Sequence, residues 1–260
     1  MRSVYGAAVF TITGLAVGAV AALLVGLSKT ALPGAAIIAT PMLATVVHGR
    51  SIAGTTLPIL LAADLFAVAW YRQDARWDLL RPLIAPVAIG FGLGAWFFVS
   101  VGTATRPLDV TIGVIVLSMV AIQVFRSARR VAAADASVAA AAGYGTDGGF
   151  TTFVSNTAGP IMNTYLVRLG LDKHEMIGTS AWFYFVVNMT KVPIYLALGA
   201  WSAGGHFFTG ESLAYDLTLV PMVVIGAYGG RRLFPHLPQQ LFLGIVLVLS
   251  AAGAVKLLLP

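Results

Sequence analysis

Two lysines and one aspartate interrupt the apolar stretches of this sequence, and side chains of these types could bind an anion or carry a proton. Lys29 follows the first apolar run, Asp64 lies within residues 52–71 and Lys191 lies within residues 176–199. If these stretches cross a membrane, each buried ammonium group costs roughly 2.5 kcal/mol or more. Such a group should therefore face a cavity, a carboxylate or an anionic ligand.

Each of these charged residues allows two interpretations. Lys191 either binds an anionic ligand or forms a structural salt bridge with Asp64. Lys29 either joins the same anion site or occupies an ordinary cytoplasmic turn. Asp64 could bind a coupling proton or pair with a lysine, and the same alternatives hold for Asp147. Asn188 precedes Lys191 by three residues, shares its helix face and would add a neutral donor.

Uncharged polar side chains could complete such a site with hydrogen bonds to a small polar solute. Serine and threonine in membrane helices also commonly bond to their own helix or to a neighbouring one, which is the structural alternative for each of them. The candidates are Ser28, Thr30, Thr55, Ser155, Asn156, Thr157, Asn163 and Thr179.

The sequence contains no recognisable catalytic or metal-binding motif. It has no P-loop, no G-x-S-x-G and no H-E-x-x-H pattern. Cysteine is absent, and the 4 histidines share no metal-ligand spacing. The basic residues are scattered between apolar runs, which argues against nucleic-acid binding. We therefore expect neither an enzyme nor a bound cofactor or metal.

The composition is that of a membrane protein, since 58% of the 260 residues are hydrophobic, 10% are charged and the mean hydropathy is +0.89. A hydrocarbon core about 30 Å thick needs roughly 20 apolar helical residues. The sequence predicts an all-α polytopic membrane protein with about 8 to 10 membrane segments. The apolar stretches lie at 4–27, 31–47, 52–71, 79–101, 107–125, 132–154, 161–169, 176–199, 213–229 and 239–259.

The positive charges predict an orientation, because Lys and Arg collect in alternate loops and such loops usually face the cytoplasm. The opposite loops hold only Arg2, Arg50, Arg106 and Lys256. This bias predicts that both termini lie outside the cytoplasm. The predicted cytoplasmic residues are Arg72, Arg76, Arg81, Arg126, Arg129, Arg130, Arg168, Lys173, Arg231 and Arg232.

An internal repeat divides the chain into residues 1–130 and 131–260. Two matches share an offset of 124 residues: Gly54-Thr55 with Gly178-Thr179, and Asp64 with Asn188. Each half contains five apolar segments, and an odd number makes the second copy enter the membrane in the opposite orientation. The sequence therefore predicts two inverted repeats within a single membrane domain.

Each half also contains a break that suits irregular backbone, at Gly26–Gly34 and at Ser155–Pro160. Only about nine apolar residues separate the second break from Arg168, which is too short to span a bilayer. We expect a re-entrant hairpin there and, by symmetry, in the first half. The two breaks should meet near the membrane midplane, where half-helix N-termini can attract anions. Paired broken helices in inverted repeats are typical of transporter sites.

Several segments carry a family resemblance: Gly26-Leu-Ser-Lys-Thr-Ala-Leu-Pro-Gly34 leading to Pro41, Arg50-Ser-Ile-Ala-Gly-Thr-Thr-Leu-Pro58 with Asp64 and Tyr71-Arg72, Asn156-Thr-Ala-Gly-Pro160, Tyr165-Leu166, and Gly178-Thr179 through Asn188 and Lys191. Across nearly the entire chain the sequence resembles the TauE/SafE sulfite exporter family. The resemblance implies a transporter of the bacterial inner membrane. It also implies a sulfur-containing anion such as sulfite, thiosulfate or an organosulfonate as substrate, moved without ATP.

These observations favour a secondary carrier for a small anion. Lys29 and Lys191 would bind the negative group, Asn188 and Asn156 with the hydroxyl residues would shape the pocket, and Asp64 would take the proton. An anion channel is the alternative, and a membrane-embedded enzyme or assembly factor is a weaker one because no loop is long enough for a domain. The expected partners are the small anion and the lipid bilayer. Glycine and alanine faces would also permit a homodimer.

Overall fold

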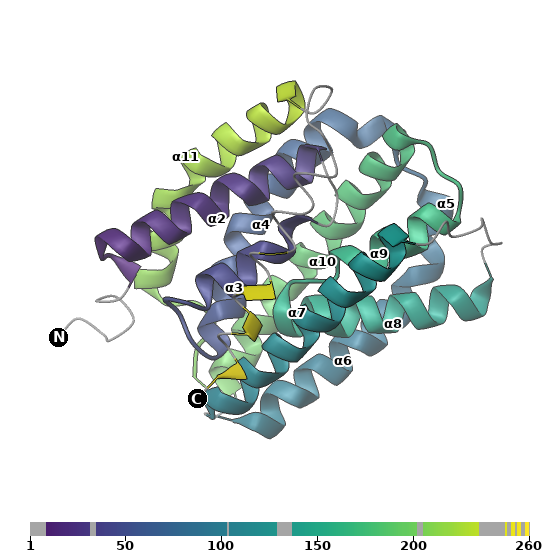
Figure 1. The fold of residues 1–260 in the computed structure, drawn as a ribbon. Helices are drawn as coiled ribbons and strands as arrows, with labels where there is room; N and C mark the ends of the chain where they lie inside the picture. Colours follow the sequence, from purple (N-terminus) through teal and green to yellow (C-terminus); the bar gives the residue numbers. More distant parts are fainter. Residues whose placement is uncertain are drawn as a thin grey trace.

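A computed structural model describes residues 9–31, 35–102, 104–128, 137–201 and 205–233, with 248, 251–252, 254–255 and 258–259. Both termini, residues 32–34 of the first predicted break, Arg129, Arg130, Lys256 and most of 239–259 lie outside this part. Its elements are all helices (Figure 1). They are α2 (Ile12–Ala31), η1 (Ala35–Ile38), α3 (Ala39–Leu43), α4 (Arg50–Tyr71), η2 (Arg72–Asp74), α5 (Trp77–Leu80), η3 (Arg81–Leu83), α6 (Ile84–Val101), α7 (Thr105–Ala128), α8 (Val138–Ser155), α9 (Gly159–Arg168), α10 (Lys173–Trp201) and α11 (Gly210–Leu233).

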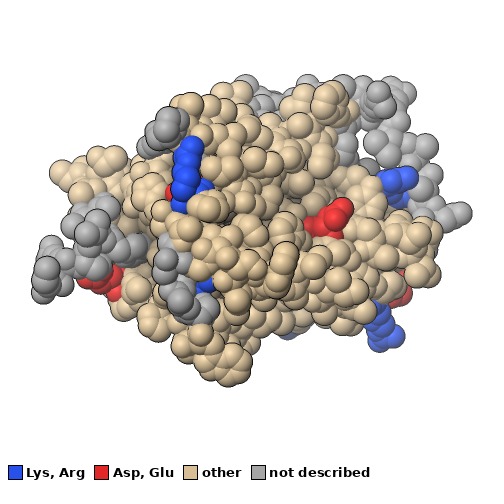
Figure 2. Space-filling model, turned by 90° about the horizontal axis from the view of Figure 1, so that it is seen from below, with Lys and Arg blue, Asp and Glu red and all other residues tan. Residues whose placement is uncertain are grey.

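Six helical stretches in the described part of the chain are long and apolar enough to cross a membrane. They are Ile12–Ala31, Arg50–Asp74, Trp77–Val101, Thr105–Ile122, His174–Trp201 and Gly210–Arg232. The face in Figure 2 carries few charged side chains. Large apolar residues such as Trp96 and Leu217 are exposed, as expected for a surface in contact with lipid. The all-α membrane protein predicted from the sequence is thus confirmed. The number of 8 to 10 membrane segments stays a prediction.

The second predicted break is confirmed and has a clear local cause. The helix α8 begins at the cap residue Ser137, whose side chain accepts a hydrogen bond from the Ala140 amide. It ends at Asn156, which adopts a left-handed conformation with φ of 57°, a geometry that asparagine tolerates better than most residues. The short helix α9 then folds back along α8, where Arg168 Nη1 donates to the Tyr144 hydroxyl at 3.0 Å. The two helices therefore form a hairpin.

The first break begins later than the sequence predicts. The helix α2 continues to Ala31, so the expectation of irregular backbone from Gly26 onwards is wrong for residues 26–31. Gly26 serves packing instead of irregularity, because a side chain there would collide with the Val223 carbonyl of α11. From residue 35 the chain continues through η1 and α3, both of which contact α2.

Two close helix pairs are built on small residues, α2 with α11 and α6 with α8 (Figure 1). In the first pair, a Cβ on Gly230 would lie 2.7 Å from the Leu27 carbonyl oxygen. In the second, a Cβ on Gly149 would lie 2.6 Å from the Val87 carbonyl oxygen. Contacts advance in the same direction along both partners, so each pair is parallel. Glycine at these contact points lets the paired helix backbones approach closely.

Replacing Gly90 by alanine should destabilise the protein by about 1–3 kcal/mol, the range typical of overpacking. A Cβ on Gly90 would collide with backbone atoms of Thr146 and Phe150 on α8, which cannot move as a flexible side chain can. Gly92 is the matched control on the same helix, since a Cβ there meets nothing within 4 Å. Apparent unfolding temperatures in detergent should fall for Gly90→Ala and stay level or rise for Gly92→Ala. Equal temperatures for the two variants would contradict this packing.

The helices α4 and α10 run antiparallel and carry the central polar residues. Asp64 of α4 meets Asn188 of α10, and the start of α10 lies beside the end of α4. At that end Arg76 Nη1 lies 3.2 Å from Glu175 Oε1, and the Arg231 guanidinium lies 4.8 Å from the Trp70 ring centroid. Arg76 and Arg231, from two of the predicted cytoplasmic loops, therefore lie at the same end of the molecule.

Candidate anion-binding site

One buried ion pair joins the end of α2 to the middle of α4. Lys29 Nζ lies 2.6 Å from Asp64 Oδ1, and their side chains are 6% and 0% exposed. Asn188 Nδ2 of α10 donates to the other carboxylate oxygen, Asp64 Oδ2, at 2.6 Å. The Lys29 ammonium also lies 4.1 Å from the centroid of the Tyr184 ring, a cation–π contact. The alternative pairing of Asp64 with Lys191 is therefore wrong, because Lys29 occupies that carboxylate.

Lys191 is fully buried and is held by neutral groups. Its Nζ donates to the Thr152 carbonyl oxygen at 3.0 Å, to Thr152 Oγ1 at 3.1 Å and to Asn156 Oδ1. An ammonium group has three N–H donors, and these three acceptors match them. No carboxylate of the described residues lies within ion-pair distance of Lys191. A positive charge on Lys191 therefore has no carboxylate to compensate it at close range.

A small cavity lies between these two clusters and has room for about 20 Å³, roughly one water molecule. Two polar atoms of its lining residues are buried and have no hydrogen-bond partner among the described residues, the Tyr184 hydroxyl and Asn188 Oδ1. The Tyr184 hydroxyl is thus an unused donor on a ring that contacts the Lys29 ammonium, and Lys191 reaches the cavity only through Thr152 and Asn156. The lining residues are Lys29, Ala36, Ile37, Leu60, Thr152, Asn156, Gly159, Tyr184 and Asn188.

The two broken helix pairs meet directly at this place. Thr40 Oγ1 of α3 donates to the Ser155 carbonyl oxygen at the end of α8, at 2.5 Å. Asn156 links the same break to α4, because its Nδ2 donates to the Ala53 carbonyl oxygen at 3.1 Å. The Asn156 side chain thus connects α4 to Lys191, because its nitrogen donates to Ala53 and its oxygen accepts from Lys191. Side chains from both halves of the chain build one site.

Several predicted site residues are buried but serve other contacts. Ser28 Oγ donates to the Val25 carbonyl of its own helix, and Ser155 and Thr157 bond to each other. Thr30 Oγ1 donates to Ala227 of α11, and Thr179 Oγ1 accepts from the Arg76 amide at the far end of α10. Thr55 and Asn163 are buried outside the cavity lining, and Asp147 is exposed on α8. The free backbone donors expected around Lys29 are absent because residues 28–30 are helical.

Sequence reasoning missed two residues of the site, Thr152 and Tyr184. Both follow the helical period, since Thr152 precedes Asn156 and Tyr184 precedes Asn188 by one turn. Listing the residues one turn away from each predicted polar residue would have identified them. Asp216, which is 4% exposed within α11, was also not among the residues predicted from the sequence.

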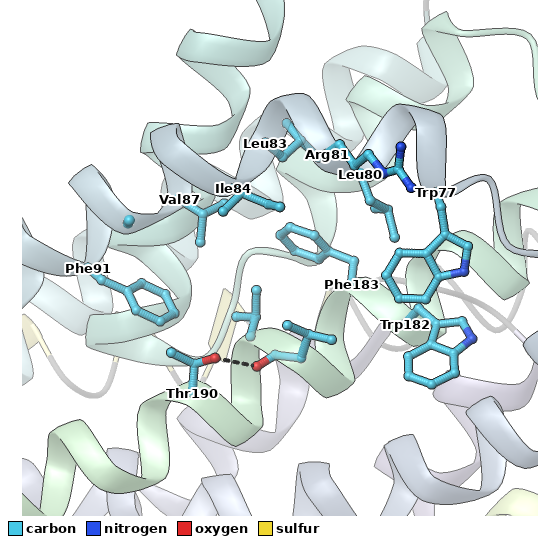
Figure 3. A pocket seen from close by; sticks show the side chains of 13 residues that line it. Trp77, Leu80, Arg81, Leu83, Ile84, Val87, Phe91, Trp182, Phe183 and Thr190 are labelled. Atoms are coloured by element: carbon cyan, nitrogen blue, oxygen red, sulfur yellow. Dashed lines mark hydrogen bonds between the residues drawn. The ribbon is translucent and has the colours of Figure 1, made fainter.

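A larger cavity of about 220 Å³ lies elsewhere, between α6 and α10. Figure 3 shows Val87 and Phe91 on one wall and Phe183 and Thr190 on the other. Its lining is almost wholly apolar, with Arg81 at one end as its charged residue. An anion would lose its hydration there without gaining a counter-charge, so this cavity does not fit the anion.

Comparison with known proteins identifies the family of the chain. No curated protein and no solved structure gave a significant match to the chain. The profile of the family described as sulfite exporter TauE/SafE, however, matches residues 15–257 and thus nearly the whole chain. The resemblance carried by the motifs around Lys29, Asp64 and Lys191 is confirmed. The chain is a multi-pass membrane protein of the sulfite exporter TauE/SafE family, a family of transporters.

Proposed function

We propose that this protein is a secondary carrier that moves a small, singly charged, sulfur-containing anion across the inner membrane of a bacterium. Hydrogensulfite and organosulfonates are anions of this class. The observation that carries the proposal is a pair of buried lysines of which only Lys29 has a carboxylate partner, Asp64, while Lys191 is held by neutral groups. Family membership supports a sulfur oxyanion as the substrate.

The charge balance of the site favours a singly charged anion. Lys29 and Lys191 contribute two positive charges and Asp64 contributes one negative charge, which leaves a surplus of one. A charge of this kind in a membrane interior is costly unless an opposite charge approaches it. A singly charged anion would neutralise the site, whereas a doubly charged one would create a new excess.

Binding requires local movement, because the cavity has room for roughly one water molecule and an organosulfonate is larger. Lys191 holds Asn156 and Thr152, and these neutral acceptors can be exchanged for the oxygen atoms of an anion. Such an exchange would free the end of α8 at the break. Substrate binding and movement of the second broken pair would then be coupled.

Replacing Tyr184 by phenylalanine should weaken anion binding about tenfold to 100-fold while leaving the fold intact. The phenol oxygen is a buried donor without a partner, and a hydrogen bond to a charged group contributes about 1.5–3 kcal/mol. The phenyl ring preserves the contact with the Lys29 ammonium. Titration of purified protein with an organosulfonate measures the effect, and an affinity equal to wild type would remove the Tyr184 hydroxyl from the site.

The contacts support an inverted-repeat architecture for residues 1–130 and 131–260. The first helix of each half packs in parallel against a late helix of the other half, α2 against α11 and α8 against α6. Equivalent tyrosines make equivalent bonds, since Tyr71 donates to the Thr30 carbonyl near the end of α2 and Tyr195 to the Phe153 carbonyl near the end of α8. These tyrosines share the offset of 124 residues that relates Asp64 to Asn188.

The two halves differ in one respect that supports alternating access. Between α4 and α11, the rings of Phe66, Trp70 and Tyr228 are in contact, with 5.0 Å between the centroids of Trp70 and Tyr228. The corresponding space between α6 and α10 is the apolar cavity of Figure 3. The α2–α11 pair thus packs directly against α4, whereas the α6–α8 pair is separated from α10 by this cavity. Exchange of these two arrangements between the halves would alternate access to the central site.

Counterflow in proteoliposomes tests this function. Vesicles loaded with an unlabelled organosulfonate should transiently concentrate the labelled compound, because a carrier exchanges one molecule for another at each cycle. A channel would let the label equilibrate without any overshoot, and an enzyme would change it chemically. Either of these results would overturn the carrier, and counterflow of carboxylates alone would overturn the sulfur-containing substrate.

A further inference from the structure

Asp216 is a buried carboxyl group to which the proposed anion site assigns no role. It lies in α11, about 9 Å along the helix from its first residue, and is 4% exposed. Both of its carboxyl oxygen atoms are buried and have no hydrogen-bond partner among the described residues. Asp64, by contrast, has both an ammonium partner and an amide donor.

The ionisable groups on the helices packed against α11 lie elsewhere or have other partners. In α2 the only one is Lys29, which pairs with Asp64 and lies near the opposite end of the helix. In α4, Arg50 stacks over Phe98 and Phe207, and the Tyr71 hydroxyl donates to the end of α2. None of these groups in the described part of the chain forms an ion pair with Asp216.

The remaining ionisable groups belong to α11 itself. The neighbouring Tyr215 hydroxyl donates to the Gly14 carbonyl of α2 at 2.6 Å, so it bonds away from the carboxyl group. Glu211 lies in the first turn of the helix, and Tyr228, Arg231 and Arg232 lie in its second half. None of the described ionisable groups of α2, α4 and α11 is therefore placed to balance a negative charge on Asp216.

An ionised carboxylate without a partner in a membrane interior costs several kcal/mol, so the carboxyl group carries a proton while it is buried. Loss of the proton to water leaves a carboxylate that favours a hydrated position. The helix α11 packs along α2, whose end carries Lys29, and Tyr215 fixes the two helices together at the level of Asp216. A negative charge on Asp216 would thus disturb the packing of α11 against α2, the helix that carries Lys29.

We propose that Asp216 is the proton-binding residue of the carrier. It holds one proton while α11 is packed against α2 and α4, and releases that proton to water when movement of α11 exposes it. This inference rests on the proposed carrier function and adds its coupling ion. One proton is transferred from the carboxyl group to water, and the reverse transfer restores the packed state, so no other reactant is needed.

The test uses proteoliposomes and an organosulfonate, which keeps a single negative charge on both sides of a pH gradient. Wild-type protein should accumulate the sulfonate when a pH gradient is imposed and should not respond to replacement of sodium by choline. Asp216→Asn, which resembles the protonated carboxyl group, should lose accumulation and keep counterflow. Asp216→Glu should recover part of the accumulation, and Asp147→Asn, which alters an exposed aspartate, should behave as wild type.

Infrared spectroscopy provides a second measurement that does not depend on transport. The carbonyl stretch of a protonated carboxyl group should be present in wild-type protein at neutral pH and absent in Asp216→Asn. Absence of counterflow in wild-type protein would overturn the carrier function, while this band would still report on the proton. Accumulation that survives in Asp216→Asn, accumulation that follows sodium, or a band unchanged by the substitution would each overturn the role of Asp216.

Discussion

Replacing Lys191 by methionine should reduce saturable anion transport by about 30-fold or more, because loss of a buried charged partner typically costs about 2–5 kcal/mol of binding. Methionine has a similar length and fills the same space without a charge. The substitution leaves Lys29 and Asp64 to neutralise each other, so the site loses its surplus positive charge. Counterflow of a labelled organosulfonate measures the effect.

Thr190→Ala is the matched control for this prediction. Thr190 is the preceding residue of α10, is exposed, and its hydroxyl donates to the Val186 carbonyl of its own helix. Both variants should be expressed and purified as folded protein, and only Lys191→Met should lose transport. Equal transport in the two variants would show that Lys191 has a structural role and does not bind the anion.

Replacing Asp64 by leucine should destabilise the protein by about 3–5 kcal/mol, because it leaves the Lys29 ammonium buried without its carboxylate. Replacing both partners, as Lys29→Met with Asp64→Leu, should recover most of this loss. An apolar pair of similar volume is often as stable as a buried ion pair. The apparent unfolding temperature in detergent measures both effects.

The double variant also provides the control for this prediction. If Asp64→Leu destabilises only by removing a partner from Lys29, the double variant must unfold well above the single one. A double variant as unstable as Asp64→Leu would mean that Asp64 stabilises the fold through Asn188 alone. A single variant as stable as wild type would contradict the buried ion pair itself.

The polar residues that could be predicted were those whose presence in an apolar segment is costly. Lys29, Asp64 and Lys191 stand out in the sequence for this reason, and the structure brings all three to one region. Which lysine pairs with Asp64 could not be predicted, because hydropathy does not determine how distant helices face each other. Tyr184 and Thr152 do not stand out by residue type, and only their position one helical turn from Asn188 and Asn156 could have identified them.

Of the two helix breaks, one could be located from the sequence and the other only in part. The second one was predictable because the segment after it is too short to cross a membrane, and Asn156 and Pro160 both suit its backbone. In the first half, Gly26 resembles a helix breaker in sequence, yet it is a contact point for α11. Only the position of the neighbouring helix distinguishes these two uses of glycine. Asp216, in contrast, could have been found with the rule that identified Asp64.

Equilibrium binding of a panel of anions to the purified protein tests the central claim most directly. The panel should contain an organosulfonate, hydrogensulfite, thiosulfate, chloride and a small carboxylate, each titrated into wild type and Lys191→Met. The account predicts saturable binding of a singly charged sulfur anion to wild type and its loss in the variant. Equal binding to both proteins, or binding of carboxylate or chloride without any sulfur anion, would contradict it.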